Sequence, residues 1–267
     1  MAATKAIELD PDLEVAWRLR GRVRGEKGDW DAMIADETRA IELDPGSAFA
    51  WQYLGVARSV KGDWDGAIAD ETRAIELDSG LAAAWQTRGM ARYEKADWDG
   101  VIADEMRAVE LDAASPLAWQ RCGMARFRKG DWDGAIADET KTIELNPGLV
   151  EAWQVRGAAR ASKGDLDGAI ADETKTIELA PALAGAWETR ATARFRKGDW
   201  DGAIADETKA IALVPDFALA WAHRGEARGQ KGDLRGGIAD LEHALQLDPS
   251  LGKFRLVLDQ LRKRVTK

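Results

Sequence analysis

The sequence contains one cysteine, Cys122, and two histidines, His223 and His243. A single cysteine forms no disulfide within the chain, and two histidines on different predicted helices, with no cysteine beside them, do not match a usual zinc motif. No apolar run approaches the roughly 18 residues of a membrane-spanning helix. The N-terminus lacks the basic flank and apolar core of a signal peptide. We therefore expect a cytoplasmic protein that uses no metal or other cofactor and does not bind membranes.

The sequence also lacks the local motifs of common enzymes. It has no glycine-rich phosphate loop, no G-x-S-x-G segment and no paired cysteine and histidine. The segment 63–66, Asp-Trp-Asp-Gly, resembles part of a calcium-binding loop, but Thr72 stands where such a loop needs a glutamate. The net charge of −9 disfavours a phosphate backbone as the main partner. These absences predict a protein that is not an enzyme and does not bind nucleic acid.

What the sequence does contain is a repeat with a period of 34 residues. The segment Lys129–Lys141 returns almost unchanged at 61–73 and at 197–209. One tryptophan column comprises Trp17, Trp51, Trp85, Trp119, Trp153, Trp187 and Trp221. A second comprises Trp30, Trp64, Trp98, Trp132 and Trp200. The two columns account for all 12 tryptophans, which indicates an array of stacked units, each burying its apolar surface against its neighbours.

Each unit reads as two helices joined by a tight turn. The first half of the unit Ala48–Leu81 shows the spacing of one helical face, in Trp51, Leu54, Gly55 and Arg58. Gly62 then ends this helix, and Asp63 is a suitable N-cap for a second helix. Proline or glycine after most second helices prevents their continuation. The sequence therefore predicts a chain of helical hairpins.

The repeated motif resembles that of the tetratricopeptide repeat (TPR) family. The matching elements are Trp-x-x-x-Gly, then Gly-Asp-Trp, then Ala-Ile, and finally Ala-Ile-Glu-Leu-Asp-Pro. The resemblance covers seven full units in residues 14–251, with the end of a second helix in residues 1–13 and a capping helix in residues 252–267. It implies an all-α fold, a right-handed superhelical α-solenoid of tandem helix-turn-helix repeats, with a concave groove lined by the first helix of each hairpin. In the capping helix we expect Phe254, Leu258 and Leu261 to face inward.

Two charged columns depart from the family pattern. Arginine occupies the position seven residues after each tryptophan of the first column, in Arg24, Arg58, Arg92, Arg126, Arg160, Arg194 and Arg228. Glutamate occupies an aromatic position of the second helix, in Glu37, Glu71, Glu105, Glu139, Glu173 and Glu207. We expect the columns to pair as an internal Arg–Glu ladder, because a buried charge needs an opposite charge. A second interpretation is a binding strip for a charged polymer. Cys122 replaces arginine in a further column, and we interpret it as a buried packing thiol.

The candidate binding residues come from the first helices, at the positions that face the groove in the family. They are Gln52, Val56, Gln86, Met90, Tyr93, Gln120, Met124, Phe127, Gln154, Glu188 and Phe195. Glutamine pairs with an extended peptide backbone, and methionine and aromatic side chains adapt to varied ligands. The alternative interpretation is that the methionines fill the junctions between units and the glutamines form a solvated face.

The leading hypothesis is a non-catalytic scaffold of bacterial type, whose concave groove binds an extended or helical segment of another protein. A second hypothesis is a structural protein in which the incomplete ends of successive molecules complete one another, giving head-to-tail oligomers or filaments. A third is that these repeats belong to a longer enzyme or signalling protein. The sequence does not name the ligand.

Overall fold

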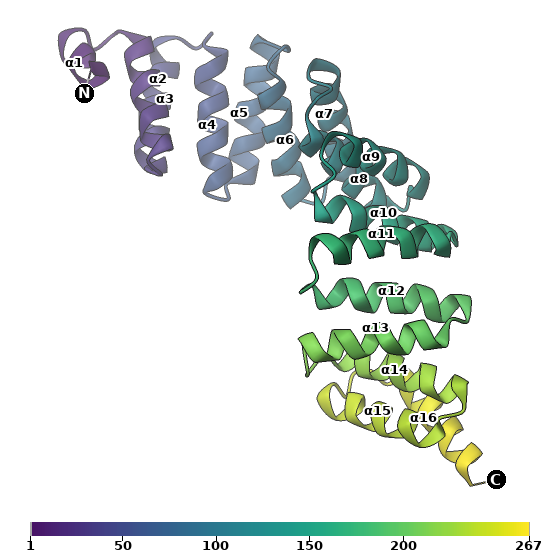
Figure 1. Ribbon diagram of the computed structural model, residues 1–267. Coiled ribbons are helices and arrows are strands. Elements are labelled where there is room, and N and C mark those ends of the chain that lie inside the picture. The colour runs from purple at the N-terminus through teal and green to yellow at the C-terminus, as the bar shows by residue number, and fades with distance from the viewer. Residues whose placement is uncertain (1, 267) are drawn as a thin grey trace. The chain divides into compact units, whose positions relative to one another are not determined.

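The computed structural model describes residues 2–266, and every regular element in that range is an α-helix (Figure 1). The helices are α1 (Ala2–Leu9), α2 (Glu14–Glu26), α3 (Trp30–Leu43), α4 (Ala48–Val60), α5 (Trp64–Leu77), α6 (Ala82–Glu94), α7 (Trp98–Leu111), α8 (Pro116–Lys129), α9 (Trp132–Leu145), α10 (Val150–Lys163), α11 (Leu166–Leu179), α12 (Ala184–Lys197), α13 (Trp200–Leu213), α14 (Ala218–Lys231), α15 (Leu234–Leu247) and α16 (Lys253–Val265). The predicted all-α repeat fold is confirmed. Met1 and Lys267, the outer ends of the predicted partial repeat and capping helix, lie outside the described range. Within that range, no helix has both the length and the apolar character needed to cross a bilayer.

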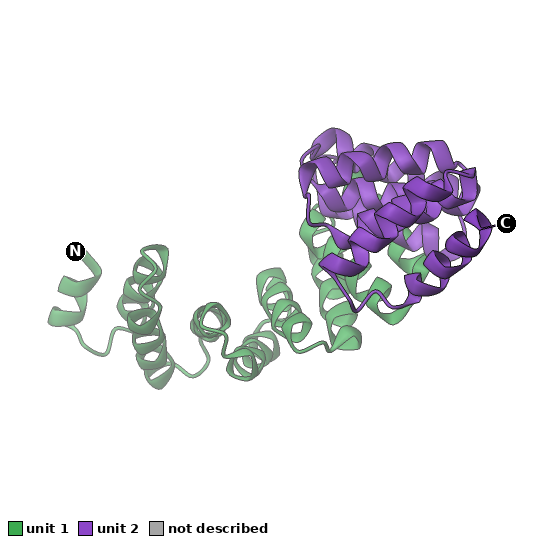
Figure 2. Cartoon of the chain, turned by 90° about the horizontal axis from the view of Figure 1, so that it is seen from below, with its two compact units in different colours: residues 1–145 green, residues 146–267 purple. Residues whose placement is uncertain are grey.

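The chain divides into two compact units, residues 1–145 and 146–267 (Figure 2). The first unit holds α1 and the hairpins α2–α3, α4–α5, α6–α7 and α8–α9; the second holds α10–α11, α12–α13, α14–α15 and the single helix α16. Within the first unit, α4 contacts α2 and α6, and α6 also contacts α8. Within the second, α14 contacts both α12 and α16. Among the described residues, the second helices of successive hairpins do not pack against one another in a comparable way. Within each unit, contacts between successive hairpins therefore also involve first helices that pack against one another.

The turn inside each hairpin has the structure that its Gly-Asp pair predicts. In α4–α5, Gly62 adopts a left-handed φ of 78°, and the Asp63 carboxylate accepts a hydrogen bond of 3.0 Å from the Gly66 backbone N–H. Aspartate caps the other six second helices in the same way. In the α6–α7 turn the glycine is replaced by Ala96, which keeps a φ of 57°. Ala96 is the one residue other than glycine with a positive φ within residues 2–266.

We expect Ala96→Gly to stabilise the protein by about 0.5–1 kcal/mol. The left-handed conformation costs an L-residue roughly 1–2 kcal/mol, and the greater freedom of glycine in the unfolded chain cancels only part of that gain. Urea denaturation measures the difference. The matched control is Gly130→Ala in the α8–α9 turn, where φ is 80° and the nearest atom to an added Cβ is 3.7 Å away, leaving ordinary space for it. This control should lose a similar amount, and identical stability of all three proteins would contradict the reasoning.

The first tryptophan column packs between hairpins, as predicted. Trp51 of α4 and Trp85 of α6 both pack against a buried cluster that contains Ile75 of α5. Each indole also donates a hydrogen bond to the backbone carbonyl six residues earlier, as Trp51 does to Pro45 at 3.1 Å. Two tryptophans of the second column, Trp98 and Trp132, make aromatic contacts within their own hairpins. Trp132 meets the ring of Phe127 edge-on with a centroid separation of 5.0 Å. The tryptophans therefore join hairpins to one another and also brace individual hairpins.

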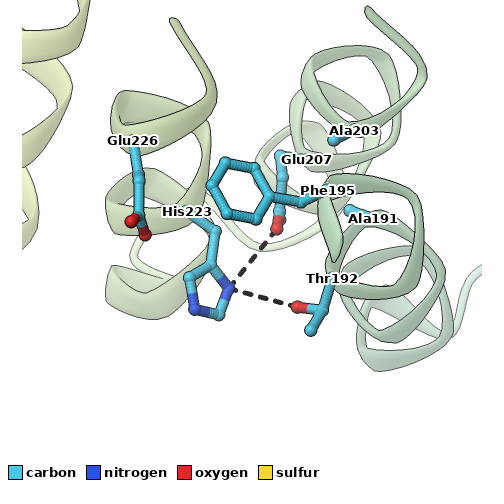
Figure 3. Close-up of a pocket in the computed structure, with 7 residues that line it drawn as sticks. All are labelled: Ala191, Thr192, Phe195, Ala203, Glu207, His223 and Glu226. Atoms are coloured by element: carbon cyan, nitrogen blue, oxygen red, sulfur yellow. Dashed lines mark hydrogen bonds and ion pairs between the residues drawn. The ribbon is translucent and has the colours of Figure 1, made fainter. Parts of the chain in front are cut away.

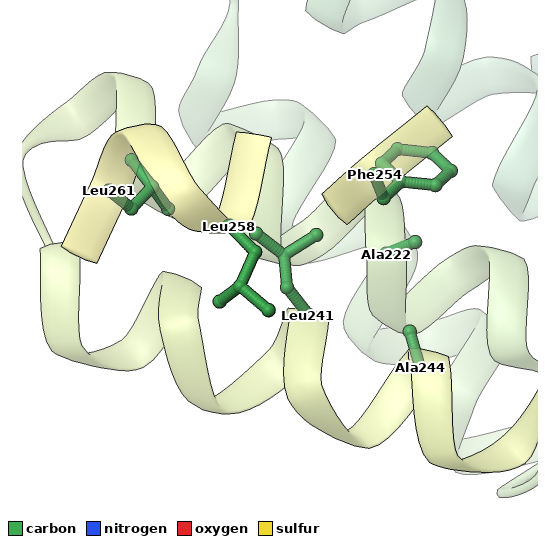
Figure 4. Close-up of a cluster of buried hydrophobic side chains, with 6 residues drawn as sticks. All are labelled: Ala222, Leu241, Ala244, Phe254, Leu258 and Leu261. Atoms are coloured by element: carbon green, nitrogen blue, oxygen red, sulfur yellow. The ribbon is translucent and has the colours of Figure 1, made fainter. Parts of the chain in front are cut away.

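The helix α16 covers the last hairpin of the second unit. Phe254, Leu258 and Leu261 face inward as predicted and form one buried cluster with Leu241, Ala222 and Ala244 (Figure 4). Leu241 stands where the earlier hairpins carry the buried glutamate, so the final junction is apolar. An apolar junction beneath a helix with charged outer side chains is the usual end of a repeat array.

Candidate functional site

The arginines of the first helices bind aspartate, and the predicted Arg–Glu ladder is wrong in its acidic partner. In α6–α7, Arg88 makes a bidentate contact with Asp104, with Nη2 2.7 Å from Oδ1 and Nε 2.9 Å from Oδ2. Arg92 Nη1 lies 2.9 Å from the same carboxylate. Four other hairpins repeat this Arg–Asp–Arg cluster, in Arg20–Asp36–Arg24, Arg156–Asp172–Arg160, Arg190–Asp206–Arg194 and Arg224–Asp240–Arg228. The arginines are thus internal structural groups rather than an open strip for a charged polymer.

Two hairpins lack one arginine of the cluster. Leu54 and Cys122 occupy its position. Among residues 2–266, Asp70 is therefore paired only with Arg58, and Asp138 only with Arg126. Burial outweighs the one remaining arginine and raises the pKa of Asp70 and of Asp138 to about 6. Cys122 is buried, as predicted, and its burial raises the pKa of the thiol to about 12. The thiol therefore stays protonated at neutral pH.

The glutamate column lies beneath the small residue of each first helix. Glu37, Glu71, Glu105, Glu139, Glu173 and Glu207 are all buried. A Cβ added to Gly55 would lie 2.7 Å from Glu71 Oε1, so glycine provides the room that the carboxyl group occupies. Burial raises the pKa of Glu71 to about 10 and that of Glu37 to about 9. Neither carboxyl oxygen of these two residues has a hydrogen-bond partner within residues 2–266. Both groups are therefore protonated and neutral at pH 7.

A cation meets the buried carboxyl group in two places. Arg121 Nη1 donates to Glu105 Oε1 at 3.0 Å, and the pKa of Glu105 rises only to about 7, because this arginine opposes the effect of burial. Arg121 follows Glu105 by 16 residues, and His223 follows Glu207 by the same number. The equivalent positions in the other hairpins are Leu19, Tyr53, Thr87, Val155 and Thr189. Arg121 and His223 thus differ from the residues at the equivalent positions, and each places a basic side chain next to a buried glutamate.

His223 belongs to a cluster that joins three helices of the second unit (Figure 3). Its Nδ1 is 3.0 Å from Glu188 Oε1, 3.4 Å from Thr192 Oγ1 and 3.6 Å from Glu207 Oε1. The imidazole ring packs edge-on against Phe254 with a centroid separation of 5.4 Å. Burial acts to lower the pKa of His223, but the two carboxylates outweigh it and raise the pKa to about 9. Burial also raises the pKa of Glu207, to about 8.

Sequence reasoning did not find this cluster. Its members come from α12, α13 and α14, and no local motif joins them. Two signals were present in the sequence. Glu188 replaces the glutamine found at the same position in the four preceding units, and His223 takes the position that Arg121 holds three units earlier. Each substitution introduces charge at a position that faces a neighbouring hairpin, and together they mark one junction as different from the rest.

In the first unit, the predicted binding residues lie on α4, α6 and α8, the three first helices that contact one another in series. Val56, Met90, Tyr93, Met124 and Phe127 are half-buried. Gln52 and Gln120 are only 8% and 9% exposed, and the amide of Gln86 donates to Ser115 Oγ at 3.0 Å. The glutamine row is therefore less open than a solvated face. The accessible remainder of this surface is chiefly methionine and aromatic.

In the second unit, the predicted residues separate into two environments. Gln154 on α10 is half-buried. Glu188 and Phe195 on α12 lie at the His223 cluster, where Glu188 binds His223 and Phe195 lines the adjoining cavity. Their assignment to peptide binding stays a prediction.

Comparison with known proteins gives a consistent result for the fold. A family model described as tetratricopeptide repeat matches residues 188–251. YrrB, described as a TPR protein with an unusual peptide-binding site, is 24% identical, and the alignment covers 69% of this chain and 95% of that chain with a TM-score of 0.64. MamA is 27% identical over 62% of this chain and 96% of its own, with a TM-score of 0.58. The C-terminal part of a TPR repeat-containing protein from Cytophaga hutchinsonii is 17% identical over 88% and 96%, with a TM-score of 0.73. Among curated proteins, none matches this chain.

Proposed function

This chain is a tetratricopeptide repeat protein, and from that premise we propose that it is a non-catalytic scaffold that binds a segment of another protein along its first helices. The proposed site is the first-helix face, which we define as the surface of α6 and α8 formed by Met90, Tyr93, Met124 and Phe127. The observation that carries the proposal is the arrangement of these four side chains. They repeat in register on two first helices that contact each other, and all four remain half-buried.

Two physical features support a peptide segment as the ligand. Tyr93 and Phe127 are braced edge-on by Trp98 and Trp132, with centroid separations of 5.1 and 5.0 Å, so they lose little freedom on binding. Met90 and Met124 are flexible and polarizable, which suits a surface that accommodates varied apolar side chains. The peptide-binding site named for YrrB is a property of that protein, and it supports the same class of partner here.

The test replaces Met90, Tyr93, Met124 and Phe127 together by serine. We expect at least a tenfold loss of affinity for a partner segment isolated with the parent protein, since aromatic anchors carry much of the energy of such interfaces. The matched control changes Arg73, Arg107 and Lys141, which are exposed on the second helices α5, α7 and α9, to serine. Circular dichroism confirms that both variants remain helical. Retention of the partner by the fourfold variant, or equal losses in both variants, would contradict the proposal.

Self-association is a second candidate, favoured by the apolar surface at α1 and α2. Leu9 of α1 is 79% exposed. A shallow hollow of about 210 Å³ between α1 and α2 is lined by Leu13, Val15, Ala16 and Leu19, among others. A second copy of this chain would cover these side chains in a head-to-tail contact. Sedimentation of the parent protein and of Leu19→Ser over a range of concentrations tests this candidate. A concentration-independent monomer in both cases would remove it.

A further inference from the structure

Three potential metal ligands converge in the second unit. Glu188 of α12, Glu207 of α13 and His223 of α14 each offer one atom, and the three atoms lie within 4.8 Å of one another. The distances from His223 Nδ1 to the two glutamate oxygens are 3.0 and 3.6 Å. Ligands bound at 2.0–2.1 Å to a tetrahedral zinc ion are about 3.3–3.4 Å from one another. The two observed separations bracket that value.

The Glu207 carboxylate gives an independent reason to expect a ligand. Its side chain is 1% exposed, and neither oxygen has a hydrogen-bond partner within residues 2–266, since 3.6 Å to His223 exceeds hydrogen-bond length. The group lines a cavity of about 70 Å³ together with His223, Thr192 and Phe195 (Figure 3). This volume accommodates an ion and a water molecule, whose share of liquid volume is about 30 Å³. Within residues 2–266, the one ion pair of Glu207, to His223 at 3.6 Å, is long. A buried carboxylate with no hydrogen bond and only a long ion pair is costly, and a bound cation would remove that cost.

We propose that Glu188, Glu207 and His223 bind a divalent transition-metal ion, with zinc the best match. One imidazole nitrogen and two carboxylate oxygens supply three zinc ligands, and the cavity leaves a fourth position for water. The two charges of the ion balance the two carboxylates. Calcium and magnesium fit poorly, because they prefer six or more ligands that are all oxygen. The Thr192 hydroxyl donates to Glu188 Oε1 at 3.1 Å and holds that carboxylate in position.

The site occurs at one junction because three residues depart from the repeat there. Glu188 replaces a glutamine, His223 replaces the threonine found at Thr189 in the preceding unit, and Ala191 replaces a glycine. Ala191 is the equivalent of Gly55 in the α4–α5 hairpin. A Cβ added to Gly55 would lie only 2.7 Å from Glu71 Oε1, and Ala191 carries a Cβ at that place. Glu207 is therefore excluded from the position that Glu71 occupies. Its carboxylate lies toward His223 instead (Figure 3).

The competing explanation is that His223 only neutralises Glu207, as Arg121 neutralises Glu105. The two explanations differ in what the metal-free protein does when zinc is added. Titration of the full chain with zinc chloride, followed by calorimetry, distinguishes them. We expect one zinc per chain, a rise in the midpoint of thermal unfolding with zinc concentration, and reversal by a chelator. Calcium chloride should have no such effect.

The variants use residues that the repeat already tolerates. Glu188→Gln and His223→Thr restore the residues of the preceding unit, Gln154 and Thr189, so both should fold. Each is expected to weaken zinc binding at least 100-fold, and the bound cobalt(II) analogue should lose its tetrahedral absorption bands. His243→Gln, which removes the other histidine, should bind zinc as the parent does. Absence of zinc binding to the parent, or unchanged binding in either Glu188→Gln or His223→Thr, would overturn the proposal.

Discussion

Replacing Asp104 by asparagine is expected to lower the free energy of unfolding by about 3–5 kcal/mol, the usual cost of removing one partner from a buried ion cluster. Asp104 is 1% exposed and is held by Arg88 and Arg92. Asparagine is nearly the same size, so the change removes charge and leaves the packing in place. Arg88 and Arg92 then lose the carboxylate that they share, and Arg92 keeps only its longer ion pair of 3.7 Å with Asp97. Arg88 is itself buried against Trp85, with its guanidinium 4.8 Å from the ring centroid. Urea denaturation followed by circular dichroism measures the loss.

The matched control is Asp70→Asn in the preceding hairpin. Leu54 stands there in place of one arginine, so Asp70 has a single ion-pair partner in its own hairpin, Arg58. Its raised pKa, about 6, indicates that the folded state holds the Asp70 charge less firmly. We expect a loss of about 1.5–3 kcal/mol, the range for a hydrogen bond to a charged group. A loss for Asp104→Asn no larger than that of the control would contradict the role assigned to the paired arginines.

Glu71→Gln is expected to stabilise the protein by about 1–3 kcal/mol at pH 8 and to have almost no effect at pH 5. Burial raises the pKa of Glu71 from its ordinary value of 4.5 to about 10. The folded protein therefore retains a proton that the unfolded chain releases above pH 4.5. Stability contributed by the neutral form is fully present below that pH and is lost as pH rises toward 10. Glutamine stays neutral throughout this range and so avoids the loss.

Urea denaturation of parent and variant at pH 5 and pH 8 checks this prediction. Glu76→Gln serves as a control, because Glu76 lies on the same helix with its side chain exposed and paired to Arg73. Its effect should stay within about 0.5 kcal/mol at both values, as for most surface substitutions. The parent itself should lose stability between pH 5 and pH 8, since Glu37 and Glu173 also have raised pKa values, of about 9 and 8. A gain in parent stability over that range would show that the buried glutamates are ionised in the folded protein.

The hairpins and their turns were predictable from the sequence because periodicity determines which side chains share a face. The positions of Gly62 and Asp63 gave the turn, and Phe254, Leu258 and Leu261 gave the inner face of α16. These features depend on contacts within one hairpin or between consecutive helices. The same repeat then sets them at every equivalent position.

The charged interior was only partly predictable. Asp104 and Glu105 are consecutive, and both are buried. Residue spacing along the first helix does not say which of the two meets Arg92, and the structure assigns the arginine to the aspartate. The His223 cluster was not foreseen because Glu188 and His223 are 35 residues apart on different hairpins. Its geometry depends on side-chain positions that Ala191 alters at that one junction.

Site-specific photo-crosslinking tests the central claim most directly. A photoreactive amino acid at position 93 lies on the proposed first-helix face, and one at position 107 lies on the exposed side of α7. In the native source, we expect the probe at 93 to attach covalently to a discrete segment of a partner protein, and the probe at 107 to give no such product. Partner attachment from position 107 with none from position 93 would contradict the claim that the first helices carry the binding site.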